Sequence, residues 1–101
     1  MENQQIKQKI MADTTALMSL KVDNYELVKH TFSTIRDRVE DLYSPIPEES
    51  ENYAKAFNLI KEAMNTEYKQ FSESITYDEK EQALIQLRHK AAEVCELIIT
   101  N

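Results

Sequence analysis

The 101-residue chain contains no glycine and no tryptophan. Several catalytic frameworks need glycine, because only a residue without a Cβ allows their sharp backbone turns or the close approach of backbone to a ligand. The absence of glycine therefore excludes phosphate-binding loops, dinucleotide-binding fingerprints and the nucleophile elbow of hydrolases. An enzyme built from this chain would need a different geometry.

Proline is scarce, and its two copies, Pro45 and Pro47, both lie in the stretch 44–50. A proline removes one backbone donor and biases the preceding residue away from helix. Two prolines this close predict a break in the chain. The sequence on both sides of the break has the apolar periodicity of helices.

Cysteine occurs once, at Cys95, so an internal disulfide is excluded. A single thiol is typical of a reducing compartment such as the cytoplasm of a bacterium. The N-terminus lacks the basic start and apolar run of a signal peptide, and no apolar run is long enough to span a membrane. We therefore expect a soluble cytoplasmic protein without membrane insertion, in which Cys95 is a partly buried apolar residue and not a nucleophile.

Twelve basic and eighteen acidic side chains give a net charge of −6. This balance disfavours direct binding to nucleic acid or to an anionic membrane surface. With 42% hydrophobic residues, the chain can build a core. Its length predicts a single domain over residues 1–101.

Two helices are expected before the proline stretch. The first runs from Gln4 to about Leu20, and the second begins with Asp23 as N-cap and Glu26 completing a capping box. Val22 and Leu27 are expected to form a hydrophobic staple at this start. The second helix carries a heptad seam, formed by Val28, Phe32, Ile35, Val39 and Leu42.

Two more helices follow the prolines. The third begins at Ser50 or Asn52 and ends near residues 72–74, and the fourth begins at a capping box of Thr76 and Glu79. The apolar stripe of the third helix is Tyr53, Phe57, Ile60, Met64, Tyr68 and Phe71, widened by Ala56, Leu59 and Ala63. The seam of the fourth is Leu84, Leu87, Ala91, Val94 and Ile98.

Four amphipathic helices joined by short links predict an all-α fold, an antiparallel up-down-up-down four-helix bundle. In the alternative architecture, the first two helices merge across residues 21–24 and two chains pair their long hairpins in a dimer. The sequence is therefore compatible with a monomer or a homodimer. The methionines Met11, Met18 and Met64 are expected to fill gaps in the core, with a methionine-lined binding groove as the alternative.

The two histidines are the obvious candidates for chemistry. His30 follows Glu26 by one helical turn, and His89 precedes Glu93 by one turn, which is half of a metal-ligand pattern. In the expected bundle the two histidines lie at different depths and do not share a site. We expect no catalytic residue, no metal and no cofactor; an enzyme or metal carrier built on either histidine is the competing hypothesis.

The central link is the candidate partner-binding surface. Between Arg36 and Asn52 there are six acidic residues and two arginines, a local net charge of −4. The residues predicted to contact a protein partner are Tyr43, Ile46, Glu48, Glu49 and Tyr53. An apolar Ile46 held between two prolines is either folded back onto the core or offered to a partner. A solvated loop is the competing interpretation.

The order of these signals resembles a known family. The stretches that carry the resemblance are Lys21-Val22-Asp23-Asn24-Tyr25 opening the second helix, the proline-containing link 44–50, and Ile75-Thr76-Tyr77-Asp78-Glu79 opening the fourth. Together they resemble the layout of class IIa bacteriocin immunity proteins of the enterocin A immunity type. The resemblance implies an antiparallel four-helix bundle that protects a producing cell at the cytosolic side of the bacteriocin's membrane receptor, without a catalytic residue.

Two functional hypotheses follow. The first is a non-enzymatic helical protein that binds another protein, with bacteriocin immunity as its most specific version. The second is an acidic regulator or inhibitor of phage or plasmid type, which covers a basic surface of its target by charge.

Overall fold

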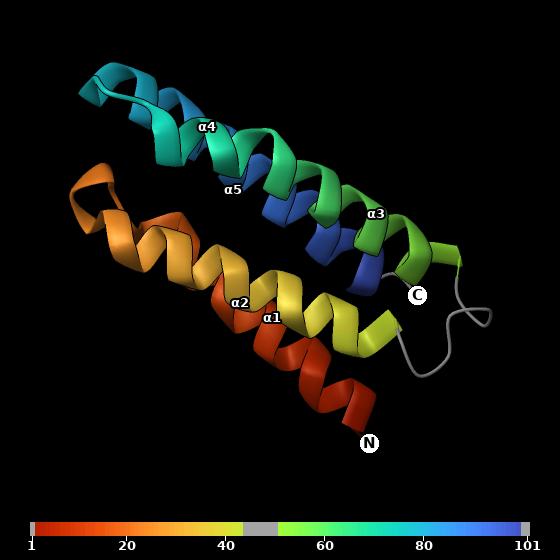
Figure 1. The fold of residues 1–101 in the computed structure, drawn as a ribbon. Coiled ribbons are helices and arrows are strands. Elements are labelled where there is room, and N and C mark those ends of the chain that lie inside the picture. Colours follow the sequence, from red (N-terminus) through yellow and green to blue (C-terminus); the bar gives the residue numbers. More distant parts are fainter. Residues whose placement is uncertain (1, 44–50, 100–101) are drawn as a thin grey trace.

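The computed structural model describes residues 2–43 and 51–99, and this part of the chain is all-α, without a strand. Its elements are α1 (Glu2–Ser19), the 3₁₀ turn η1 (Val22–Asn24), α2 (Tyr25–Tyr43), α3 (Glu51–Asn65), α4 (Glu67–Glu73) and α5 (Tyr77–Ile99) (Figure 1). The predicted all-α class is therefore confirmed.

The helices pack side by side along the long dimension of the molecule, which measures 42 Å against 21 and 18 Å across. Helix α1 packs against α2 and α5, and α3 packs against the same two helices. The turn η1 and the link from α4 to α5 lie at one end, while the ends of α2 and α5 and the start of α3 lie at the other (Figure 1). We call the first of these ends the turn end.

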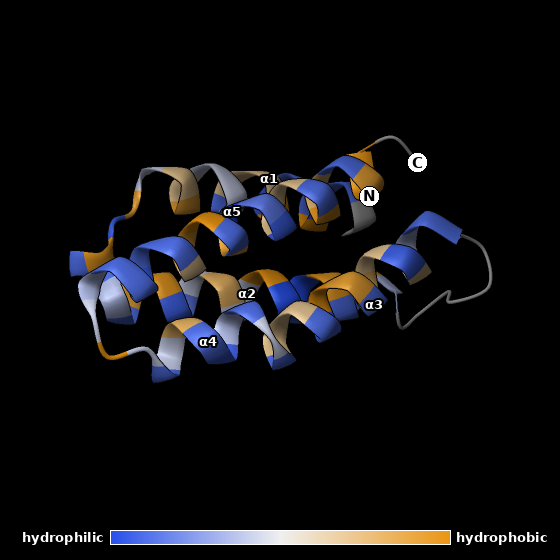
Figure 2. Ribbon diagram, turned by 90° about the horizontal axis from the view of Figure 1, so that it is seen from above, coloured by the Kyte–Doolittle hydropathy of each residue, from blue (hydrophilic) through white to orange (hydrophobic). Residues whose placement is uncertain are grey.

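One continuous apolar core lies between the helices, and apolar and polar residues alternate along each helix accordingly (Figure 2). The largest fully buried side chains are Phe32, Phe71, Ile10, Leu17, Ile35, Leu42, Ile60, Leu84, Leu87, Ile98, Val28 and Val39. The heptad seams predicted for the second and fourth helices are buried throughout.

Helices α1 and α2 are separate, because Lys21 is extended between them (φ −119°, ψ 173°). The expected capping box of Asp23 and Glu26 is wrong, because the bonded pair lies two residues earlier in the chain. Asn24 Oδ1 accepts a hydrogen bond from the Lys21 N–H at 3.1 Å, and α2 begins at Tyr25. The Asn24 N–H in turn donates to the Lys21 carbonyl at 2.9 Å.

The third predicted helix is interrupted at Thr66, which separates α3 from α4 with φ −119° and ψ −84°. The Thr66 hydroxyl donates to the carbonyl of Glu62 at 2.9 Å, and this bond to the preceding turn is a common cause of local bending. The predicted apolar face of α3 is buried, but its centre is shifted within that face: Ala56 and Ala63 are buried, whereas Phe57 and Met64 are half-buried at its edge.

The start of α5 follows the prediction. The Glu79 N–H donates to Thr76 Oγ1 at 3.2 Å, and the Thr76 hydroxyl donates to Glu79 Oε1 at 2.8 Å. Both side chains are local in sequence, so this cap depends on no tertiary neighbour. It fixes the direction in which α5 leaves the turn end.

Candidate partner-binding groove

The predicted surface at the central link is only partly within the described residues. Tyr43 is half-buried and stacks on Phe57 with ring centroids 4.9 Å apart, and Tyr53 is 8% exposed. The two tyrosines therefore cover the core at this end. Three residues of the prediction, Ile46, Glu48 and Glu49, lie outside the described residues, and their role stays a prediction.

The two histidines do not come together. His30 lies exposed on α2 and His89 lies exposed on α5, two helices that are diagonal to one another in the packing. Across the described part of the chain, no three histidine, cysteine, aspartate or glutamate side chains are grouped as a metal ion would require.

Cys95 is a partly buried thiol on α5. Burial raises the pKa of this thiol, and a smaller, opposing effect comes from a hydrogen bond with Thr14 of α1. A raised pKa leaves little thiolate near neutral pH, so the environment does not activate Cys95 as a nucleophile. The expectation of a partly buried apolar role agrees with this position.

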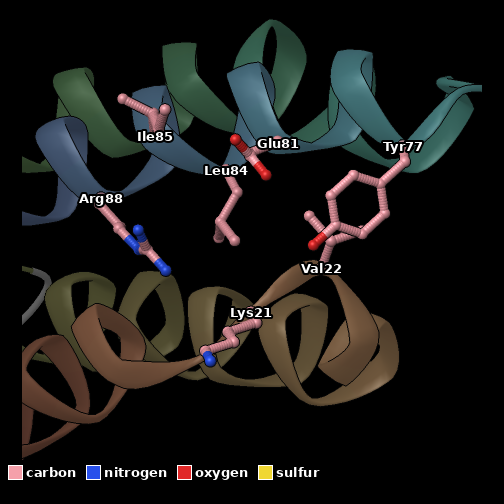
Figure 3. Close-up of a pocket in the computed structure, with 7 residues that line it drawn as sticks. All are labelled: Lys21, Val22, Tyr77, Glu81, Leu84, Ile85 and Arg88. Atoms are coloured by element: carbon pink, nitrogen blue, oxygen red, sulfur yellow. The ribbon is translucent and has the colours of Figure 1, made fainter.

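A pocket of about 290 Å³ opens at the turn end, between α5 and the segment that joins α1 to α2. Its lining residues are Lys21, Val22, Tyr77, Glu81, Leu84, Ile85 and Arg88 (Figure 3). Leu84 and Tyr77 project from α5 toward Val22, and Arg88 projects from α5 toward the end of α1. The pocket thus combines an apolar floor with two cationic side chains and one carboxylate.

A second pocket of about 370 Å³ continues from the first, since both share Ile85 and Arg88. It is lined by Met18 of α1 and by Ile85, Arg88, His89 and Ala92 of α5. The two pockets form one depression along the contact of α1 with α5. We call it the α1–α5 groove, defined by the lining residues of both pockets.

Exposed apolar side chains recur at heptad spacing along both helices beside the groove. Met11 and Met18 are 43% and 41% exposed and lie seven residues apart on one side of α1. On α5, Ile85, Ala92 and Ile99 also recur every seven residues, with Ala92 and Ile99 exposed. The expectation that Met11 and Met18 fill the core is therefore wrong. Of the methionines in the alternative of a methionine-lined groove, Met18 lines the second pocket.

Arg88 joins the groove to the fold. Its guanidinium donates a hydrogen bond from Nη2 to the Leu20 carbonyl, beyond the last turn of α1. Its Nε is buried and has no hydrogen-bond partner. A buried donor without an acceptor costs free energy, so Arg88 is only partly satisfied by the chain itself.

Aromatic contacts connect the helices at the turn end. Tyr25 stacks on Phe71 with centroids 5.1 Å apart, and its hydroxyl donates to the Ser72 carbonyl at 2.8 Å. The Lys80 ammonium lies 4.3 Å from the Tyr25 ring centroid and donates to the Phe71 carbonyl at 3.1 Å. These contacts tie the start of α2 to the end of α4 and the start of α5. Beside them, Ile75 is 90% exposed.

The sequence offered a methionine-lined groove only as an alternative and did not indicate the α5 side of the groove. The seven-residue spacing of Met11 and Met18, and of Ile85, Ala92 and Ile99, was the available signal. It marks a second apolar stripe beside each core seam, and only the packed helices show that the two stripes lie along the same contact.

Comparison with protein families, curated proteins and solved structures finds no match to this chain. None of the helices in the described ranges is both long and apolar enough to cross a membrane. The function must therefore be argued from the groove and from the sequence pattern.

Proposed function

We propose that the chain is a non-enzymatic, cytoplasmic protein that works by binding another protein through the α1–α5 groove. The observation that carries this proposal is the apolar lining of the groove by Met18, Ile85 and Ala92. Exposed Met11 on α1 and exposed Ile99 on α5 follow at heptad spacing. Exposed apolar surface arranged in a groove is typical of sites that receive a partner helix.

The proposal includes the finer architecture. If α3 and α4 are counted as one helical segment, the four segments form an antiparallel up-down-up-down bundle. The groove lies between the first segment, α1, and the last, α5. Helix α1 and helix α5 present heptad-spaced apolar residues side by side, which is the geometry that accepts a third helix. Methionine suits such a surface because its flexible side chain adapts to different partners.

The most specific version of this proposal is immunity to a class IIa bacteriocin. It is supported by the resemblance at residues 21–25, 44–50 and 75–79. In this version the protein binds at the cytosolic face of the bacteriocin's membrane receptor and needs no catalytic residue. The predicted surface around Tyr43, Ile46, Glu48, Glu49 and Tyr53 remains a second candidate for the contact.

The alternative function is an acidic regulator or inhibitor that covers a basic surface of its target. It is supported by the net charge of −6. Binding of this kind depends on long-range charge and weakens steeply with ionic strength, whereas binding through an apolar groove does not.

The test is affinity capture from the native host, membranes included, at low and moderate salt, followed by mass spectrometry. Capture that persists as salt rises supports the groove, and recovery of a sugar-permease membrane complex in the presence of a bacteriocin supports immunity. A soluble basic partner that is lost as salt rises supports the acidic regulator instead.

Variants sharpen this experiment. Met18→Glu and Ile85→Glu each place a charge in the groove and should abolish capture. Leu27→Glu is the matched control, since Leu27 is an equally apolar side chain, 50% exposed on α2 and outside the groove lining. Unchanged capture by both groove variants would contradict the proposal, and loss with Ile46→Asp alone would move the site to the central link.

A further inference from the structure

Two cationic side chains, Lys21 and Arg88, lie at the turn end of the groove. Ion pairs within the described ranges involve Arg36, Arg38 and Lys55, not Arg88 or Lys21. The Arg88 side chain is half-buried and donates a hydrogen bond to the backbone carbonyl of Leu20.

The charge balance of the groove differs from that of the whole chain. The first pocket has Lys21 and Arg88 against one carboxylate, Glu81. The second pocket has Arg88 and His89 and no acidic lining residue. A partner carboxylate beside the Arg88 guanidinium and the Lys21 ammonium accepts charge-assisted hydrogen bonds, which are the stronger class.

The rest of the pocket is apolar. Val22, Leu84 and Ile85 form its floor, and a volume of about 290 Å³ is sufficient for one or two side chains of a bound segment. The apolar stripe continues away from this pocket through Met18 and Ala92. A ligand that fits the groove therefore carries a carboxylate next to apolar side chains.

We infer that the groove binds a segment of a partner protein in which an acidic side chain is flanked by large apolar side chains. The carboxylate lies against Arg88 and Lys21 at the turn end, and the apolar side chains cover the floor and the stripe. This inference rests on the proposed function and adds the chemistry of the bound segment.

The test is a titration of ¹⁵N-labelled protein with the capped tripeptide acetyl-Leu-Glu-Leu-amide, followed through the backbone amide signals of Val22, Leu84, Ile85 and Arg88. The isosteric control is acetyl-Leu-Gln-Leu-amide, which has the same apolar groups and no charge. The glutamate peptide is expected to shift these signals and to bind about three- to tenfold more tightly than the glutamine peptide. Equal affinities, or unshifted signals at millimolar peptide, would overturn the inference.

Substitutions at two exposed positions should change the affinity for the glutamate peptide in opposite directions. Lys21→Gln should weaken the glutamate peptide about threefold, and Glu81→Gln should strengthen it by a similar factor, because each removes one charge beside the pocket. Affinity for the glutamine peptide should not change in either variant. Circular dichroism checks that both variants are folded. A change of the same sign in both variants would contradict a carboxylate at this place.

A third probe separates a peptide from a small acid. N-acetylleucine carries the carboxylate and one apolar group, and it should bind more weakly than the glutamate tripeptide. Equal or tighter binding would assign the pocket to free carboxylic acids and overturn the peptide ligand. If partner capture is lost in Met18→Glu but unaffected by Lys21→Gln and Glu81→Gln, the proposed function stands and the carboxylate inference fails.

Discussion

Arg88 of α5 donates a hydrogen bond to the backbone carbonyl of Leu20, 68 residues earlier in the chain. Leu20 lies just beyond the end of α1, where backbone carbonyls have no partner within the helix. The Leu20 N–H closes the last turn by donating to the Leu17 carbonyl at 3.2 Å. A cation at a helix C-terminus is also favoured by the helix dipole. One side chain therefore both terminates α1 and lines the groove.

Arg88→Met should lower the free energy of unfolding by about 1 to 2 kcal/mol, because the Leu20 carbonyl loses a charged donor. Urea denaturation followed by circular dichroism measures this change. Lys69→Met, on an exposed position of α4, is the control and should alter stability by less than about 0.5 kcal/mol. Equal effects of the two substitutions would show that the bond does not stabilise the end of α1.

Tyr25→Phe should cost about 1 kcal/mol, since it removes the hydrogen bond to the Ser72 carbonyl and keeps the stack on Phe71. The matched control is Tyr77→Phe, whose hydroxyl is on an exposed side chain and whose loss should be nearly neutral. Thermal unfolding of the two variants side by side decides the point. A larger loss for Tyr77→Phe would be inconsistent with the described packing of the turn end.

Phe32→Ala should destabilise the fold by about 3 to 5 kcal/mol, because Phe32 is fully buried. Phe57→Ala should cost clearly less, since Phe57 is half-buried at the edge of α3 and contacts Tyr43. Ala56→Leu should also destabilise, by about 1 to 3 kcal/mol, because Ala56 is fully buried at the centre of this face. Urea midpoints for the three variants test whether Ala56, and not Phe57, lies at the centre of the buried face of α3.

Much of the helical fold could be predicted because its signals are local. The cap of Thr76 and Glu79 needs only residues three apart, and the seams of α2 and α5 follow from their spacing. The start of α2 could not be placed, because Asp23 and Asn24 are both good capping residues and the path of the chain decides between them. Which residues lie at the centre of the buried face of α3 depends on how closely the neighbouring helices approach Ala56 and Ala63. A single sequence does not show this distance.

The groove was harder to predict than the fold. A residue such as Met18 flanks a core seam, and the sequence does not say whether a neighbouring helix covers it. In the structure Met18 is 41% exposed and lines a pocket together with Arg88. The central link shows the opposite case, because Tyr53 is polar enough to suggest a contact surface and is nevertheless buried.

Cys95 gives a pH-dependent prediction. Burial raises the pKa of the folded thiol above its ordinary value of 9.0, so the unfolded chain loses this proton first as pH rises. The contribution to stability is complete below pH 9 and is lost as pH rises through the raised pKa of the folded state. Urea midpoints from pH 7 to 10.5 should fall more in the natural protein than in Cys95→Ala. Parallel curves would contradict a raised thiol pKa.

Photo-cross-linking in the native host tests the central claim most directly. A benzophenone amino acid is placed at Ala92, an exposed lining residue of the groove, and in separate proteins at Ile46 in the central link and at Asn58, an exposed position of α3. The account predicts a covalent adduct with one partner protein from position 92, lost when Ile85→Glu is added, and no such adduct from position 58. An adduct from position 46 with none from position 92 would contradict it.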